Sequence, residues 1–398
     1  MSLAAGTDPF DALGAELEVR WRAHDRDEEC FPDVASDVLA DHPPSTWFDR
    51  DAWIDRTLDP TRAAGQQLAP TGAFGQPGVT AFAGDGFVIE VYYWLDSLSA
   101  VHNHPFCGVF TVLEGYSVHA RYAVDDVKRA GARGQVLDVR LEGLELVEAG
   151  HVQRFSLRQY PLIHALIHVP VPSISMVMRT VRTEGYLRYL PPSVAIPMEA
   201  PSEPLARRIA LVESLVAADD LRAEDCLAAT LREGDFETVV RVLAAVWGRT
   251  APEARPALLR HAAALQGPRL DAIACALDRA LRLEEATLVR SRLRDPDLRL
   301  VAAGLTYAET RTQVFELLAA RGGDPLARLR RFVDDGGHFA TDGSEEASRL
   351  IAHALVDGAG ERGALRALEL AYGVDAIADR QGDVAAYCRE SVFAPLAR

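Results

Sequence analysis

The stretch "SAVHNHPFCGVFTVLEGYSVHARY", from Ser99 to Tyr122, combines three histidines with a run of β-branched and aromatic residues. His102 and His104 flank a single residue, so on a strand their side chains point to one face with Cα atoms roughly 6–7 Å apart. Two imidazoles at this separation can bind one first-row metal ion through short metal–nitrogen bonds. The alternative is a pair of structural histidines hydrogen-bonded to carbonyls. We favour ligation because further histidines lie close by in the sequence.

Short β-branched and aromatic runs, separated by glycines and prolines, surround this stretch. They occupy residues 78–84, 86–95, 108–115, 117–124, 135–141, 161–172 and 173–181. Several short strands at close spacing are typical of an antiparallel sandwich or barrel. The sequence therefore predicts a β domain over residues 65–190.

Helical patterns lie on both sides of the predicted β domain. Apolar residues at three- and four-residue steps predict an N-terminal helical segment within residues 1–64, with a break near Pro32. Residues 191–204 contain five prolines and are predicted to be a linker. Residues 205–398 are rich in Ala, Leu and Arg with helical periodicity, which predicts an all-α C-terminal domain.

Composition narrows the functional classes. The chain has 398 residues, 48% of them hydrophobic, and a formal net charge of -16, which disfavours nucleic acid and anionic membranes as partners because the field would repel phosphate. Its five cysteines are scattered and form no C-x-x-C pair, as expected for reduced thiols. No signal peptide or transmembrane segment is recognisable in the sequence, so we expect a cytoplasmic protein.

Histidines continue beyond the opening stretch. Six of the eleven fall in one segment: His102, His104, His119, His151, His164 and His168. On a strand, His164 and His168 share a face, with Cα atoms roughly 13 Å apart. This distance suits either two metal ions, or one histidine that binds the metal and one that lies outside its ligands. His119 is interpreted either as a ligand or as a donor to a carboxylate. His151 follows a glycine in a predicted loop, where we expect it to be solvated.

Other side chains near the histidines have two interpretations. Glu90 lies within an apolar strand, and we expect it to face solvent. If buried, it must meet a metal, an arginine or water. Tyr92 and Trp94 share its face and either line a substrate pocket or belong to the core. Cys107 is expected to pack in the interior, although an iron site could also use its thiol.

Residues 102–115, "HNHPFCGVFTVLEG", resemble the first motif of the cupin superfamily. His102 and His104 match the two metal-binding histidines of that motif, and Gly115 matches its closing glycine. Cys107 stands near the position where many cupins have a glutamate. His151 lies near the place of the second motif, without its usual spacing. The resemblance implies a cupin barrel, the double-stranded β-helix, and a departure from the common ligand set of three histidines and one glutamate.

Two longer blocks resemble the dinuclear non-haem iron cupin monooxygenases, typified by a platensimycin-pathway diterpenoid hydroxylase. The first block, H-x-H-x-F-x-G and V-L-x-G-x-S-x-H, is matched by His102, His104, Phe106, Gly108, Val112, Leu113, Gly115, Ser117 and His119. The second block, I-H-x-L-x-H and P-S with V-x-R-T, is matched by Ile163, His164, Leu166, His168, Pro172, Ser173, Val177, Arg179 and Thr180. This resemblance implies one or two iron ions per chain, whereas ligand chemistry alone also admits Zn, Ni, Mn or Cu.

The sequence thus predicts an enzyme: an oxygenase that oxidises a small hydrophobic metabolite with dioxygen and an electron donor. Its predicted metal ligands are His102, His104, His164, His168 and His119. A mononuclear cupin, similar to a thiol dioxygenase or an isomerase, is one alternative. A non-catalytic metal-binding cupin that acts as a sensor or interaction module is another. A homodimer is an expectation from the cupin resemblance.

Overall fold

The chain divides into two compact units according to its internal contacts. The first comprises residues 1–121 and 145–186, and the second comprises residues 122–144 and 187–398. The computed structural model describes residues 8–59, 75–95, 99–130, 133–181, 185–266, 269–335, 345–373 and 381–397. The predicted boundary at residues 64 and 65 lies outside these ranges.

The strands form two sheets. Those described are β1 (Gly78–Ala83), β2 (Phe87–Trp94), β3 (Val101–Asn103), β4 (Gly108–Glu114), β5 (Tyr116–Ala130), β6 (Gly134–Glu148), β7 (Val152–Phe155), β8 (Ile163–His168), β9 (Ser173–Thr180), β10 (Leu187–Leu190) and β11 (Val194–Pro197). One sheet has the order β1-β2-β9-β4-β7, and the strands in the order β10-β11-β6-β5-β8-β3 form a closed barrel. The predicted β barrel is therefore confirmed, and the predicted runs overlap β1, β2, β4, β5, β6, β8 and β9.

Four short strands were not anticipated from the sequence: β3, β7, β10 and β11. Each has only three or four residues, too few to show an alternating pattern. Strand β11 lies within residues 191–204, the segment with the linker composition, and all of its residues are buried. It pairs with β10 and with β6, so tertiary pairing gives this proline-rich segment a regular structure.

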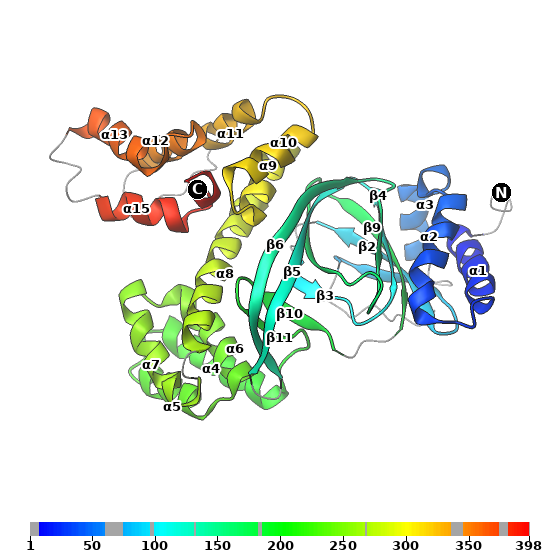
Figure 1. Ribbon diagram of the computed structural model, residues 1–398, viewed down its shortest axis with the longest axis horizontal. Coiled ribbons are helices and arrows are strands. Elements are labelled where there is room, and N and C mark those ends of the chain that lie inside the picture. The colour runs from blue at the N-terminus through cyan, green and yellow to red at the C-terminus, as the bar shows by residue number, and fades with distance from the viewer. Residues whose placement is uncertain are drawn as a thin grey trace. The chain divides into compact units, whose positions relative to one another are not determined.

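Three helices precede the strands: α1 (Pro9–Arg22), α2 (Phe31–Asp41) and α3 (Arg50–Leu58). The predicted break near Pro32 lies earlier, between α1 and α2. Pro32 occupies the first turn of α2, where a missing N–H is tolerated. Helices α1 and α2 lie beside the sheet that contains β2, β4 and β9 (Figure 1). Apolar side chains from these five elements form one core.

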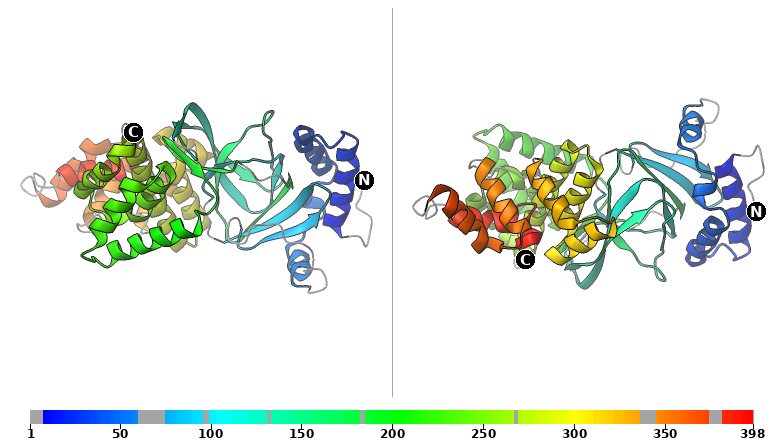
Figure 2. Two further views of the ribbon diagram at one scale, coloured as in Figure 1. Left: turned by 90° about the horizontal axis from the view of Figure 1, so that it is seen from below. Right: turned by 90° about the horizontal axis from the view of Figure 1, so that it is seen from above.

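The predicted helical C-terminal region is also confirmed. Its helices are α4 (Glu203–Ala217), α5 (Ala223–Glu233), α6 (Phe236–Val246), α7 (Arg255–Gln266), α8 (Arg269–Arg292), α9 (Pro296–Tyr307), α10 (Arg311–Ala320), α11 (Pro325–Asp334), α12 (Glu345–Val356), α13 (Gly360–Tyr372) and α15 (Gln381–Glu390). Consecutive helices pack on one another, as α8 does on α9 and α12 on α13 (Figure 2). Among the described helices, none has both the length and the apolar character needed to cross a bilayer.

Candidate metal centre

Three histidines converge because a very short strand pairs with β8. His102 on β3 lies directly opposite His164 on β8, and opposite residues of an antiparallel pair have Cβ atoms about 4.5–5.5 Å apart. His104 follows the end of β3, and its Nε2 atom lies 2.8 Å from Nε2 of His164. One possible ligand atom from each of the three residues lies within 4.8 Å of the others. The structure therefore brings together three of the five histidines predicted as ligands.

Hydrogen bonds indicate which nitrogens face this point. Nδ1 of His102 lies 2.7 Å from the carbonyl oxygen of Ala100, so it donates there and leaves Nε2 with a lone pair. Nδ1 of His164 lies 2.9 Å from Nε2 of His119, which leaves Nε2 of His164 directed at His104. Two nitrogens that each bind one ion at about 2.1 Å lie at most about 4.2 Å apart, so Nε2 of His104 and Nε2 of His164, 2.8 Å apart, are close enough to share one ion.

Burial keeps these three imidazoles neutral. It lowers the pKa of His102 to about 4, and it lowers the pKa values of His104 and His164 well below the ordinary 6.5. Charge repulsion among the clustered histidines lowers the pKa values of His104 and His164 further. Metal ions bind the neutral form of imidazole, so near neutral pH the residues are already in the form that can bind.

His119 lies behind His164, away from the point where the three residues converge. It is diagonal to His164 across the β5–β8 pair and uses Nε2 for the bond to that residue. Its Nδ1 lies 3.3 Å from Oε1 of Glu145 on β6, and the hydrogen bond from His119 lowers the pKa of Glu145. If Nε2 of His164 bound a metal, Nδ1–H of His164 would donate to Nε2 of His119, and Nδ1 of His119 would then face the Glu145 carboxylate. This placement matches the interpretation of His119 as a donor to a carboxylate.

Glu145 is the residue that the sequence did not single out. It is separated from His119 by the whole β5–β6 connection, and its strand carries other acidic residues such as Glu142 and Glu148. Only the strand pairing distinguishes Glu145 from these neighbours.

His168 lies at the other end of β8. Its Nδ1 atom is 2.8 Å from Oγ of Ser117, the residue directly opposite it on β5. Its ring stacks on Trp94, with 4.2 Å between ring centroids. Trp94 in turn donates from Nε1 to Oγ of Ser175 at 2.7 Å. The structure thus places His168 outside the three-histidine cluster, in a packed aromatic environment.

Glu90 is fully buried, so the expectation that it faces solvent was wrong. Its carboxylate accepts hydrogen bonds from Nε of Arg179 at 2.7 Å and from Nη2 at 3.1 Å. Tyr92 donates to the same carboxylate at 2.8 Å. Arg179 lies diagonally across the β2–β9 pair, so the arginine partner that burial requires comes from the neighbouring strand.

Aromatic side chains surround the cluster. The ring of His104 stacks on Phe155 at 4.2 Å and meets Phe106 edge-on at 5.2 Å between centroids. Tyr186 contacts the ring of His102 edge-on at 5.6 Å. These rings make the surroundings of the histidines largely apolar.

Two other candidates lie apart from the three-histidine cluster. Cys107 is buried in the core beneath α1 and α2, and burial raises the pKa of its thiol to about 11, as expected for a packing residue. His151 is half-buried rather than fully solvated, and this burial lowers its pKa.

No known family model and no curated protein matches this chain. Among solved structures it is similar to a protein with a double-stranded β-helix domain from Klebsiella pneumoniae, at 13% identity and a TM-score of 0.22 over 32% of this chain and 93% of the other. It is also similar to the DMSP lyase DddQ from Ruegeria pomeroyi, at 18% identity and a TM-score of 0.26 over 46% and 98%. A third is the hydroquinone 1,2-dioxygenase PnpCD, at 11% identity and a TM-score of 0.21 over 30% and 68%. TM-scores this low carry no argument about the function of this chain.

Proposed function

We propose that the barrel binds one metal ion through His102, His104 and His164 and uses it to oxidise a small, largely apolar molecule with dioxygen. The observation that carries this proposal is the convergence of three neutral imidazoles within 4.8 Å in apolar surroundings. Three imidazoles at one point exceed what packing alone needs, and neutral nitrogen donors suit a redox-active ion such as iron. The cupin resemblance of the sequence supports the same choice.

A bound iron ion would supply the activation of dioxygen, which amino-acid side chains do not provide by themselves. The chain supplies the geometry. The carbonyl of Ala100 holds the ring of His102, and His119 with Glu145 holds the ring of His164. Aromatic rings beside His104 exclude water from the same place.

One ion rather than two is favoured by the positions of His119 and His168. His119 already uses Nε2 for the bond to His164, and His168 stacks on Trp94 and bonds to Ser117. Neither residue belongs to the group of three histidines whose ligand atoms lie within 4.8 Å of one another. We therefore propose the mononuclear form of the predicted oxygenase.

Metal content tests this proposal. Protein expressed in iron-supplemented medium and purified without chelator should contain about one metal ion per chain. His104→Ala should contain almost none, whereas the control His353→Ala, which changes a histidine of α12 paired with Asp334, should retain the full content. Close to two ions per chain would support the dinuclear enzyme instead. No metal, under conditions that load a control metalloprotein, would refute the catalytic proposal.

A thiol dioxygenase is a second candidate, because no carboxylate joins the three clustered histidines among the described residues. Dioxygen consumption separates the two. A monooxygenase needs an external reductant in addition to its apolar substrate, whereas a thiol dioxygenase consumes dioxygen with a small thiol alone.

A further inference from the structure

A cavity of about 220 Å³ lies within the second unit, separate from the histidines. Its walls come from the β10–β11 hairpin and from helices α4, α6 and α8. On α8, Leu277, Ala280, Leu281 and Glu284 follow the spacing of one helix face, and the first three are apolar. For comparison, an apolar cavity of roughly 150 Å³ is large enough to bind benzene.

Arg188 is the distinctive residue of this cavity. It lies opposite Ile196 in the β10–β11 pair, and both side chains line the cavity. Part of the Arg188 side chain is exposed to solvent. The protein atoms around its guanidinium still remove enough water to lower its pKa. Among the described residues, its guanidinium has no hydrogen bond or ion pair within 4.0 Å.

The other charges around the cavity explain why Arg188 stands out. Arg241 donates from Nε to Glu237 at 2.9 Å and from Nη2 to the carbonyl oxygens of Pro197 and Glu199 at 2.8 Å each, so these two nitrogens already have partners. Glu284 is the acidic residue that lines the cavity. It forms no ion pair with Arg188 in the described part of the chain, and burial raises its pKa.

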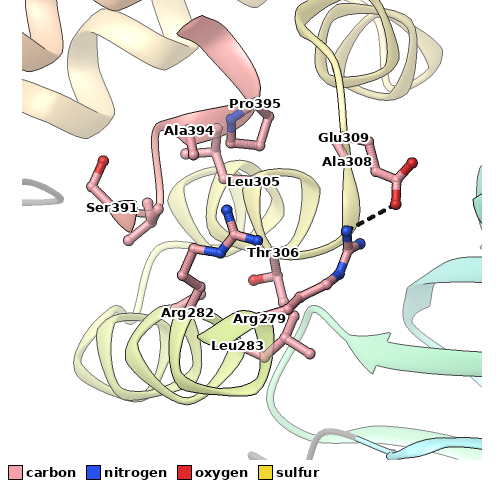
Figure 3. Close-up of a pocket in the computed structure, with 12 residues that line it drawn as sticks. Arg279, Arg282, Leu283, Leu305, Thr306, Ala308, Glu309, Ser391, Ala394 and Pro395 are labelled. Atoms are coloured by element: carbon pink, nitrogen blue, oxygen red, sulfur yellow. Dashed lines mark ion pairs between the residues drawn. The ribbon is translucent and has the colours of Figure 1, made fainter. Parts of the chain in front are cut away.

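A second cavity in the same unit shows the contrast (Figure 3). It measures about 30 Å³, room for little more than a water molecule. Its cations are already satisfied, since Arg279 pairs with Glu309 at 2.8 Å and Arg282 donates to the carbonyl of Arg389 at 2.8 Å. Of these two cavities, the larger one therefore combines apolar volume with a guanidinium that makes no hydrogen bond or close ion pair to the residues that the structure describes.

We propose that the larger cavity is a binding site for a small amphiphilic carboxylate, whose carboxylate pairs with Arg188 and whose apolar group lies against α6 and α8. A guanidinium offers a carboxylate two parallel hydrogen bonds, and the apolar walls favour removal of the rest of the molecule from water. Glu284 competes for Arg188 when its carboxyl group is ionised, and it can donate a hydrogen bond to the ligand carboxylate when it is protonated. The site is independent of the proposed metal chemistry.

The experiment measures binding of 3-phenylpropionate to the full-length protein by calorimetry, with 3-phenylpropanol and 3-phenylpropylamine as probes of the same apolar group. The carboxylate should bind at least about 10-fold more tightly than the alcohol, the value expected for one charged hydrogen-bonded contact. Arg188→Gln should weaken binding by a similar factor, and Glu284→Gln should strengthen it. Ala244→Phe, which fills part of the cavity, should weaken all three probes.

Arg208→Gln is the matched control, because Arg208 is an exposed residue of α4 that does not line the cavity. It should leave the affinity for 3-phenylpropionate unchanged, and all variants should retain wild-type helical content and metal content. Equal affinity of Arg188→Gln and wild type, tighter binding of the amine than of the carboxylate, unchanged binding in Ala244→Phe, or no binding of any probe would each overturn the proposal. None of these results bears on the metal content, so failure here is distinguishable from failure of the proposed function.

Discussion

His164 and His168 lie on the same face of the same strand, yet the two ends of β8 have different surroundings. His164 lies opposite His102 and beside His104 and His119. His168 lies opposite Ser117 and stacks on Trp94. The difference arises because β3 extends only from Val101 to Asn103, so it pairs with one end of β8 and not with the other. Equal spacing along a strand thus does not give equal roles, since the neighbouring strands decide which histidine meets others.

The largest expected difference is in metal affinity. His164→Ala removes one of three clustered donors and should reduce affinity by more than about 100-fold, beyond the loss typical for an outer partner. His168→Ala should leave both affinity and stoichiometry close to wild type. Competition with a chromophoric chelator measures both.

One result would contradict the expected difference between the two variants. If His168→Ala loses metal as His164→Ala does, both ends of β8 belong to the metal site, as a dinuclear centre requires. Circular dichroism should show unchanged secondary structure in both variants, so that the loss of a ligand is distinguished from the loss of the fold.

Acid should destabilise the metal-free protein at the His164 end of β8. His102 has a folded pKa of about 4 against an ordinary 6.5, so between these pH values the unfolded chain takes up a proton that the folded chain does not. Stability is therefore full above pH 6.5 and falls as the pH drops towards 4, by about 3 kcal/mol for this residue.

Urea unfolding of chelator-treated protein at pH 7 and pH 4 measures this effect. His102→Phe keeps an aromatic ring but cannot be protonated, so the pH dependence of its unfolding free energy should be smaller than that of wild type. An identical pH dependence in both proteins would contradict the assignment of His102 as a neutral, buried residue.

Much of this arrangement could be predicted from the sequence, and the reasons for the failures are specific. The short β-branched and aromatic runs separated by glycines and prolines predicted the barrel, and the spacing of His102 and His104 predicted two of the clustered histidines. The exposure of Glu90 was predicted wrongly because its partner Arg179 is 89 positions away, and only the β2–β9 pairing brings the two together. The opposite roles of His164 and His168 likewise depend on β3, which is too short to be recognised in the sequence.

A smaller effect should follow from loss of the carboxylate behind His119. Glu145→Gln removes the charge next to Nδ1 of His119 and weakens the hold on the ring of His164. Metal affinity should fall by about 10- to 100-fold, while saturating metal still restores one ion per chain. Glu142→Gln is the matched control, because Glu142 is an exposed residue of the same strand. Equal affinities of the two variants would show that the contact between His119 and Glu145 does not act on the metal site.

The smallest effect is expected at the His168 end. Ser117→Ala removes the hydroxyl that lies 2.8 Å from Nδ1 of His168, and both residues are buried, so the unfolding free energy should fall by about 1 kcal/mol. Metal affinity should not change, because the bond holds a ring that packs on Trp94 and lies outside the three-histidine cluster. Urea unfolding and chelator competition on the same variant separate the two quantities. If metal affinity fell as much as in Glu145→Gln, a change at His168 would alter metal binding at His164, and the two ends of β8 would be coupled.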